Sequence, residues 1–409
     1  MQSSVLLPLP MLLTSKMHPT LVKTKKRVCA MGENPLEPLP IFPSSSLHYP
    51  SGYLGAVPTP IPSLSTAVKE LRAVIDETAT ENVDDIAVVS PLQLAERFEK
   101  TFGANLWLKR EDLQPTVSFI SLAGAILSRP RGVCDDESRP REKLLRGVLT
   151  CSTGNHGLGV ALAAKKLGCR HNVVVGLPLE TRKNKIDNIK TLGADVWRFN
   201  KMDYEYGDRL LRMSAENEDS TYVPAFDHEH VIAGQGTVGF EILEQMASLP
   251  HAIFVPVGGG GLIAGIANHV KSKFPEVKII GVEPYDSNKL ALSLHYGQRV
   301  QLDKVGSYTD AIAIKTVGKL PFLLCQELID GVILVRNEDI LSAINAMFDT
   351  HRSFLEPAGA LALAGATQFA KYYDCKGKGD LVAITSGGNF EDFDSRRLRA
   401  VFEKSLSLP

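Results

Sequence analysis

In the stretch Ala252-Ile253-Phe254-Val255-Pro256-Val257-Gly258-Gly259-Gly260-Gly261-Leu262-Ile263-Ala264, four consecutive glycines separate two apolar segments. The first segment predicts a buried strand and the second a helix. Residues without a Cβ let successive backbone N–H groups turn inward beside a helix N-terminus, where they bind phosphate without a lysine. A flexible turn is the alternative, but flexibility alone does not require four glycines at this place. The stretch therefore predicts a site for a phosphorylated ligand.

The composition is that of an ordinary globular protein, with 44% hydrophobic and 22% charged residues among 409. This length is sufficient for two lobes with a sizeable core. A formal net charge of −1 gives no indication of a nucleic-acid partner, and no apolar run is long enough for a membrane helix. The six cysteines have no paired spacing, so we expect neither a disulfide framework nor a metal site.

From about residue 85, apolar runs alternate with helical patterns. The predicted strands are 147–150, 172–175, 252–257, 277–282 and 381–384, and helical segments between them include 160–167, 183–192 and 237–246. Such alternation is typical of an α/β fold on a mostly parallel sheet.

Two further polar turns follow predicted strands. One is Ser152-Thr153-Gly154-Asn155-His156-Gly157, which opens a helix and leaves backbone N–H groups free for an anion such as a substrate carboxylate. An Asn-His pair that merely satisfies a tight turn remains the alternative. The other is Ser386-Gly387-Gly388-Asn389. Because ligands of α/β proteins bind at the carboxyl ends of the strands, we expect the three turns to share one site.

The first thirty residues contain several lysines, an arginine, serines and threonines, and no acid before Glu33. This composition predicts an organelle transit peptide over 1–30; a secretory signal is the alternative, because residues 5–13 are apolar. Residues 31–87 form an N-terminal extension that is rich in proline and serine over 35–65, and we expect this stretch to be a linker without a fold of its own.

Several motifs together resemble the pyridoxal-phosphate dehydratases of fold type II, and among them the plant biosynthetic threonine dehydratases. These motifs are Lys109-Arg110-Glu111-Asp112-Leu113-Gln114-Pro115, the turn at 152–159, the tetraglycine, Gly281-Val282-Glu283-Pro284, Leu355-Glu356-Pro357-Ala358-Gly359 and Ser386-Gly387-Gly388-Asn389. The resemblance implies two parallel-sheet lobes, as in the tryptophan synthase β fold, with the cofactor between them. The catalytic domain would cover 88–400, with a small lobe at about 147–227 inserted in the large one.

The resemblance also implies roles for individual residues. Gly258, Gly259, Gly260 and Gly261 would cradle the phosphate of pyridoxal 5'-phosphate. Asn155 would donate a hydrogen bond to the phenolic oxygen of the pyridine ring, and Ser386 would bond the ring nitrogen. The substrate carboxylate would be held by the loop residues Ser152, Thr153, Gly154 and His156. Glu283 and Glu356 would either take part directly or support the site as neighbouring carboxylates.

One departure from the family pattern concerns the lysine of the motif S-F-K-x-R-G-A, which carries the cofactor covalently and moves the Cα proton. This chain reads Ser118-Phe119-Ile120-Ser121-Leu122-Ala123-Gly124-Ala125. Depending on the end from which the motif is aligned, Ile120 or Ser121 occupies the lysine position. Loss of a positioned proton-transfer group costs about 10²–10⁴-fold in rate. The segment 116–147 is also longer than the family pattern, and Ala311 stands where a glycine is expected.

The resemblance implies deamination of L-threonine to 2-oxobutanoate and ammonia, a step toward isoleucine, in the chloroplast and in a homo-oligomer. The missing lysine leaves activity in doubt. One alternative is a catalytically dead homologue that acts as a binding or partner subunit, and another is a lyase acting on serine or another hydroxy amino acid. No C-terminal regulatory domain is expected, because the chain ends at Pro409.

Overall fold

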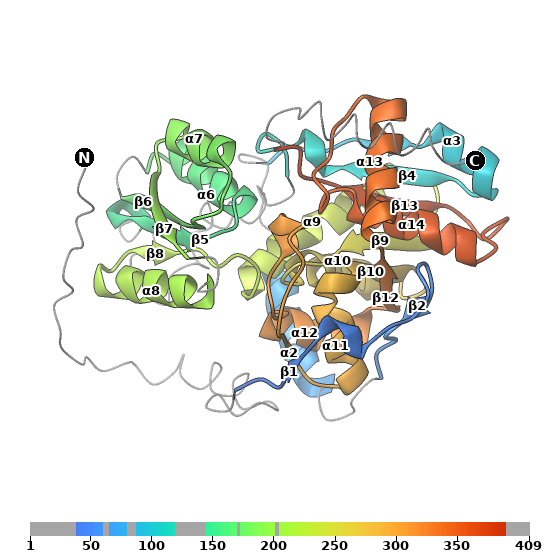
Figure 1. Ribbon diagram of the computed structural model, residues 1–409, viewed down its shortest axis with the longest axis horizontal. Helices are drawn as coiled ribbons and strands as arrows, with labels where there is room; N and C mark the ends of the chain where they lie inside the picture. The colour runs from blue at the N-terminus through green and yellow to red at the C-terminus, as the bar shows by residue number, and fades with distance from the viewer. Residues whose placement is uncertain are drawn as a thin grey trace. The chain divides into compact units, whose positions relative to one another are not determined.

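Two sheets of mainly parallel strands organise the computed structural model, which describes residues 38–59, 65–79, 87–118, 144–169, 172–200 and 204–389 (Figure 1). The described residues from Leu39 onward belong to one compact unit. In Figure 1 the green elements gather round the smaller sheet and the remaining elements round the larger one. We call these two parts the small lobe and the large lobe.

The large lobe contains a seven-stranded sheet in the order β2-β12-β10-β9-β13-β4-β3. Its inner strands are parallel, whereas the two edge strands pair antiparallel with their neighbours. The strands are β2 (Leu54–Gly55), β3 (Leu92–Leu94), β4 (Leu106–Arg110), β9 (Ala252–Pro256), β10 (Lys278–Pro284), β12 (Gly331–Val335) and β13 (Leu381–Thr385). The central strands read as continuous apolar runs because both faces of the sheet are buried.

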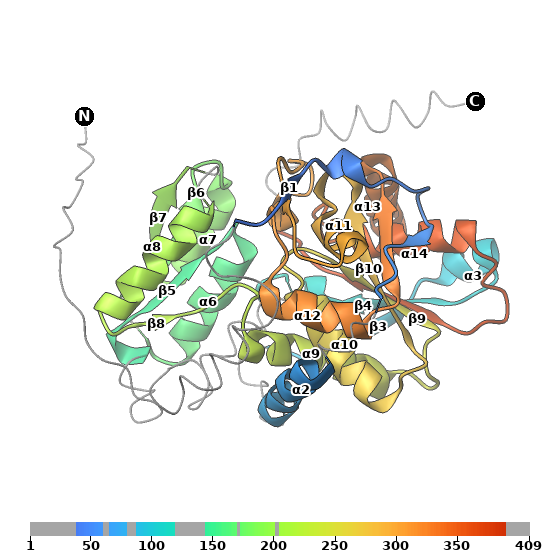
Figure 2. The ribbon, with the colours of Figure 1, turned by 90° about the horizontal axis from the view of Figure 1, so that it is seen from below.

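Helices cover both faces of this sheet (Figure 2). They are α2 (Ser65–Ala79), α3 (Glu96–Phe102), α9 (Glu229–Gln245), α10 (Gly261–Lys273), α11 (Lys289–Tyr296), α12 (Lys319–Leu328), α13 (Asn337–His351) and α14 (Leu361–Tyr372). Short 3₁₀ turns lie at η1 (Ser44–Ser46), η2 (Glu111–Leu113), η5 (Tyr285–Ser287) and η6 (Asp310–Ile312).

The small lobe is built on a four-stranded parallel sheet in the order β7-β6-β5-β8. Its strands are β5 (Val148–Cys151), β6 (Val173–Pro178), β7 (Asp195–Phe199) and β8 (Thr221–Tyr222), and its helices are α6 (Asn155–Lys166), α7 (Lys183–Thr191) and α8 (Tyr204–Asn217). In sequence, this sheet lies between β4 and β9 of the large lobe.

Two helices begin earlier than the sequence predicts, and glycines explain both differences. Helix α9 begins at Glu229 rather than near 237, and α6 begins at Asn155 rather than near 160. The glycines in these helices permit close packing: a Cβ on Gly236 of α9 would lie 3.0 Å from the Gly265 carbonyl oxygen of α10, and a Cβ on Gly157 of α6 would lie 2.4 Å from the Val175 side chain of β6. Glycine in a sequence ordinarily argues against a helix, and here tertiary packing overrides that preference.

The N-terminal extension differs from the expected linker. Strand β1 (Ile41–Phe42) pairs in parallel with β11 (Gln301–Leu302), β2 pairs with β12, and the buried side chains of α2 pack in the large core. The described parts of this extension therefore belong to the large lobe. The predicted transit peptide, 1–30, lies outside the described residues. Among the described helices, none is both long and apolar enough to cross a bilayer.

Candidate active site

A pocket at the carboxyl ends of the central strands holds about 890 Å³ of empty space, including open solvent at its mouth. The tetraglycine, the Ser152 turn and the Ser386 turn all line it. The other lining residues are Ser118, Tyr204, Ala225, Phe226, Gln235, Pro256, Leu262, Ala311, Ile312, Ile314, Glu356, Ala358 and Gly359.

The glycine loop joins β9 to α10 and presents backbone donors. Among the described residues, the N–H groups of Gly258, Gly259 and Gly260 donate to no protein acceptor. Gly260 has φ +91°, which side-chain-bearing residues rarely adopt. A Cβ on Gly259 would lie 2.1 Å from the ring of Phe226. The loop thus combines free donors with the N-terminus of α10, which is the arrangement that favours a bound anion.

The turn before α6 forms a second set of donors, and Ser152 organises it. The Ser152 hydroxyl accepts hydrogen bonds from the N–H groups of Gly154, at 2.9 Å, and Gly157, at 2.8 Å. The N–H groups of Thr153, Asn155 and His156 have no acceptor among the described residues. These three donors at a helix N-terminus suit a carboxylate.

Asn155 is fixed between two polar partners. Its Nδ2 donates to Glu356 Oε2 at 3.1 Å, and its Oδ1 accepts from Asn389 Nδ2 at 2.9 Å. The other oxygen of the carboxylate, Glu356 Oε1, lies 3.2 Å from Lys185 Nζ. One N–H of the Asn155 amide remains for a ligand, because an amide group has two.

Ser386 lines the pocket and stands directly after β13. Its hydroxyl donates to Ser118 Oγ at 3.3 Å. Gly359 allows the chain to pass close by, because a Cβ there would lie 1.4 Å from the Ser386 carbonyl oxygen. The close approach fixes the Ser386 turn against the Glu356 loop.

His156 contributes its backbone rather than a charge. Burial lowers the pKa of its ring to about 4, although a hydrogen bond with the Val223 carbonyl and the carboxylate of Asp208 both raise the pKa. The imidazole is therefore neutral at pH 7.

The motif Lys109-Arg110-Glu111-Asp112 lies beneath the site as a buried network. Lys109 Nζ donates to Glu241 and, at 2.7 Å, to the Ser90 carbonyl. Asp112 accepts from Arg110 Nη2 at 2.7 Å and from Thr385 Oγ1 at 2.8 Å. Since Thr385 precedes Ser386, this network positions the Ser386 turn.

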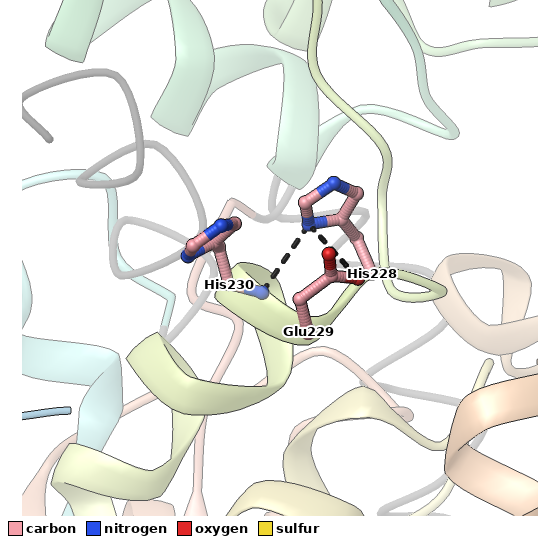
Figure 3. A group of neighbouring side chains, drawn as sticks. All are labelled: His228, Glu229 and His230. Atoms are coloured by element: carbon pink, nitrogen blue, oxygen red, sulfur yellow. Dashed lines mark hydrogen bonds and ion pairs between the residues drawn. The ribbon is translucent and has the colours of Figure 1, made fainter. Parts of the chain in front are cut away.

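Figure 3 shows a cluster of ligand-type side chains at the start of α9, namely His228, Glu229 and His230. His228 Nδ1 accepts a hydrogen bond from the His230 N–H at 3.2 Å, so this nitrogen caps the helix. A cation here would also face the positive end of the helix dipole. We propose no metal at this position.

Two of the residues predicted for the site, Ile120 and Ser121, lie outside the described residues. All the other predicted cofactor and substrate residues line the pocket except Gly154. The Gly154 N–H donates to the Ser152 hydroxyl, and a Cβ at Gly154 would lie 2.5 Å from Cδ of Lys185. Glu356 lines the pocket, whereas Glu283 is buried apart from it and ion-paired with Lys289.

Sequence reasoning missed Lys185, Phe226 and Gln235. Lys185 lies in an amphipathic helix in which a lysine looks like an ordinary surface residue. Phe226 stands in a segment without a motif, and its packing on Gly259 depends on two regions distant in sequence.

The family model for pyridoxal-phosphate dependent enzymes matches residues 83–387. The chain belongs to this family. It is 48% identical over 89% of its length to the chloroplastic biosynthetic threonine dehydratase of Arabidopsis thaliana, and 47% identical over 91% to threonine dehydratase 1 of Solanum lycopersicum. It spans 59% and 58% of the lengths of these two proteins.

Solved structures give the same family. The processed form of threonine deaminase isoform 2 from Solanum lycopersicum aligns with a TM-score of 0.78 and 38% identity, covering 91% of this chain and 99% of that one. Maize serine racemase aligns with a TM-score of 0.67 and 26% identity, covering 83% and 97%. The pyridoxal-phosphate family has the fold predicted from the motifs.

The described residues fit the family's cofactor. Three free backbone N–H groups at a helix N-terminus suit its phosphate, and the Asn155 amide and Ser386 hydroxyl suit polar atoms of its ring. Apolar side chains between them, including Phe226 and Ile312, suit the flat face of the ring.

Proposed function

We propose that this protein is a pyridoxal-phosphate-dependent deaminase of L-threonine that forms 2-oxobutanoate and ammonia. The observation that carries the proposal is that the phosphate loop at 258–260, the ring contacts and the carboxylate loop at 152–156 meet in one pocket. The likeness to threonine deaminases of tomato and Arabidopsis supports the choice of substrate.

The pocket residues would divide the work as follows. The N–H groups of Gly258, Gly259 and Gly260 hold the phosphate, Ser386 faces the ring nitrogen, and Asn155 faces the phenolic oxygen. A neutral hydroxyl opposite the ring nitrogen leaves that nitrogen unprotonated. When bound, the cofactor supplies an electrophilic aldehyde and a conjugated ring that withdraws electrons from the substrate Cα.

The substrate would enter with its carboxylate on the N–H groups of Thr153, Asn155 and His156. These donors point from a helix N-terminus and favour an anion. Fixing the carboxylate orients the Cα proton relative to the ring. His156 is neutral here, so the carboxylate is held by backbone dipoles rather than by an ion pair.

We further propose that it is a plastid enzyme of isoleucine biosynthesis and that it acts as a homo-oligomer. The relatives in Arabidopsis and tomato are described as chloroplastic and biosynthetic, and the basic, acid-free N-terminus agrees with import. A fluorescent fusion of the full chain tests this part of the proposal, and cytosolic fluorescence would contradict it.

A second candidate is a binding or partner subunit without catalysis. It is favoured by one observation, the absence of a lysine between Lys109 and Lys143, where the family motif carries one. A lyase on serine is the third candidate, since serine presents the same carboxylate, amine and β-hydroxyl.

The experiment is a ketoacid assay of the full chain with pyridoxal phosphate and either L-threonine or L-serine. The proposal expects 2-oxobutanoate at a rate above that of the cofactor alone. Equal rates with and without protein, together with retained cofactor, would favour the binding subunit. Faster pyruvate formation from serine would favour the third candidate.

Phosphate recognition is tested separately by equilibrium dialysis with pyridoxal phosphate and with pyridoxal. The glycine loop predicts that the phosphorylated form binds at least tenfold more tightly. Gly258→Ala should reduce this ratio, because its Cβ would lie 3.2 Å from the Ile312 side chain and shift the loop slightly. An unchanged ratio would contradict the placement of the phosphate.

A further inference from the structure

Three lysines are fully buried among the described residues, namely Lys109, Lys185 and Lys289. Each of them pairs with a glutamate, because removing an ammonium group from water is costly unless it is paired. Of the three glutamates, only Glu356, the partner of Lys185, lines the pocket. One buried cation of this chain therefore faces a carboxylate of the candidate active site.

The same carboxylate belongs to a chain of hydrogen bonds that fixes the orientation of the Asn155 amide. The Thr116 carbonyl only accepts, so the atom of Asn389 that donates to it, at 3.1 Å, is Nδ2. This Nδ2 also donates to Asn155 at 2.9 Å, and the accepting atom is therefore Oδ1. Asn155 Nδ2 is left facing Glu356, whose Oε2 accepts from it at 3.1 Å. The group that Asn155 has left for a ligand is thus an N–H donor and not an acceptor.

Among the described contacts, the Lys185 side chain reaches this network only at Glu356. Its Nζ lies 3.2 Å from Glu356 Oε1, an oxygen that accepts no hydrogen bond in the described structure. The Lys185 side chain is buried and does not line the pocket. A Cβ on Gly154 would lie 2.5 Å from Lys185 Cδ, so the stem fills the space beside the turn before α6. The ammonium therefore acts on the site through the carboxylate and not by touching a ligand.

Few other titratable groups surround this carboxylate in the described part of the chain. His156 and Tyr204 line the pocket, where burial lowers the pKa of His156 to about 4 and raises the pKa of Tyr204 well above its usual value. Both are therefore uncharged at pH 7. Arg182, which precedes α7, and Asp310 of η6 are partly exposed and lie 3.9 Å apart as a pair of their own. Among the described residues that line the pocket, Glu356 is thus the one that carries a charge.

We propose that Lys185 is a positioning residue of the cofactor site, which acts through Glu356 to hold the Asn155 N–H at the phenolic oxygen of pyridoxal phosphate and to cancel the charge of the carboxylate there. The proposal rests on the proposed function, which places the phenolic oxygen at Asn155. An ionised oxygen accepts from an N–H more strongly than a neutral one does, but an uncompensated carboxylate nearby opposes its ionisation. With Lys185 in place, Asn155 stabilises the ionised oxygen without that opposition.

Pyridoxine 5'-phosphate is the probe that tests the proposal on the full chain. It has the phosphate, the ring and the phenolic oxygen of the cofactor, but no aldehyde with which an amine could react. Because its neutral and ionised phenol absorb at different wavelengths, a pH titration of the bound probe measures the pKa of the phenol. Equilibrium dialysis at each pH checks that the probe remains bound. The measurement does not depend on whether the chain deaminates threonine.

Opposite changes of charge should move the pKa of the bound phenol in opposite directions. Lys185→Met leaves the carboxylate uncompensated and should raise this pKa by about 1 unit, the low end for a charge close by. Glu356→Gln leaves the ammonium uncompensated and should lower it by about 1 unit. The double variant Lys185→Met/Glu356→Gln carries neither charge and should return close to the native value. Lys183→Met is the matched control, because it removes an 88% exposed lysine from the same helix, and it should change nothing.

A phenol pKa that Lys185→Met leaves unchanged would overturn the proposal. A shift in the same direction in both single variants would also overturn it, because a pair that acts only through packing has no sign of charge to transmit. If Lys185→Met does not fold, Glu356→Gln and the double variant decide the question. Absence of probe binding to the native chain would refute the cofactor placement together with this proposal. Opposite shifts without threonine deamination would refute the proposed function alone, and deamination without shifts would refute this proposal alone.

Discussion

Two buried lysine–glutamate pairs differ in how completely their partners are satisfied. Glu283 accepts from Lys289 and from the N–H groups of Leu290 and Ala291, at 3.0 and 2.9 Å, and both members of the pair are fully buried. Glu356 accepts from Asn155 on one oxygen and leaves the other with only the ammonium of Lys185 beside it. We call them the scaffold pair and the pocket pair.

This difference indicates two roles: the scaffold pair stabilises the fold, whereas the pocket pair can interact with a ligand. Burial raises the pKa of Glu283, and the ammonium of Lys289 and two backbone N–H groups oppose that shift. A charge with every partner in place stabilises one geometry and has nothing left to offer a ligand. The pocket pair keeps an oxygen, Glu356 Oε1, that accepts no hydrogen bond among the described residues, and its glutamate lines the pocket.

The largest effect should come from breaking the scaffold pair. Lys289→Met leaves the Glu283 carboxylate buried without its cation, which costs about 3–5 kcal/mol of the free energy of unfolding. Chemical denaturation of the full chain measures the loss. The double variant Glu283→Gln/Lys289→Met should recover part of it, and no recovery would mean that the lysine acts through packing rather than charge.

Acid should also lower the free energy of unfolding through His156, a residue of the pocket. Because burial lowers the pKa of His156 to about 4, the unfolded chain, with an ordinary value of 6.5, binds more protons between these limits. The free energy of unfolding therefore falls as the pH falls through this window, by on the order of 3 kcal/mol in total.

His156→Gln should remove that part of the acid loss, as measured by denaturation at pH 7.5 and 4.5. Glu111 changes in the opposite sense: burial raises its pKa to about 7, so its contribution is lost as the pH rises from 4.5. The unmodified chain and the His156→Gln variant both contain Glu111, so the difference between their acid losses is due to His156. Equal acid losses in the two proteins would contradict a neutral, buried imidazole.

A smaller stability effect should follow from breaking the pocket pair. Lys185→Met should cost about 1–3 kcal/mol, less than the scaffold variant, because the Glu356 carboxylate left without its cation lines a pocket that water can enter. Added pyridoxal phosphate should stabilise Lys289→Met and Lys185→Met alike, since the phosphate loop remains in both. If Lys185→Met were the more destabilised of the two, the distinction between the pairs would be wrong.

The elements that the sequence predicts well are those with local signals. Strand β9, the tetraglycine and α10 follow from one uninterrupted run, because both faces of β9 are buried. Strands β1 and β2 were missed, since two-residue strands in a proline-rich extension have no period to detect.

The site likewise contains features that local sequence predicts and features that it does not. Its donor loops are visible because glycines and serines follow strands directly. The pairing of Lys185 with Glu356 is not visible, because it joins residues 171 positions apart across the two sheets. The place of Gly154 against the Lys185 stem, likewise, depends on the packing of α7 beside the turn before α6.

The smallest expected effect concerns that contact, and two glycines isolate it. Gly154 and Gly168 both have positive φ, +139° and +79°, so alanine is strained at either position. A Cβ at Gly154 would lie 2.5 Å from Lys185 Cδ, whereas a Cβ at Gly168 has no neighbour within 4 Å. Gly154→Ala should therefore cost about 1 kcal/mol more in unfolding free energy than Gly168→Ala, the low end for a methyl group added to filled space. Equal losses of unfolding free energy in both variants would show that the Lys185 stem does not depend on the absence of a side chain at 154.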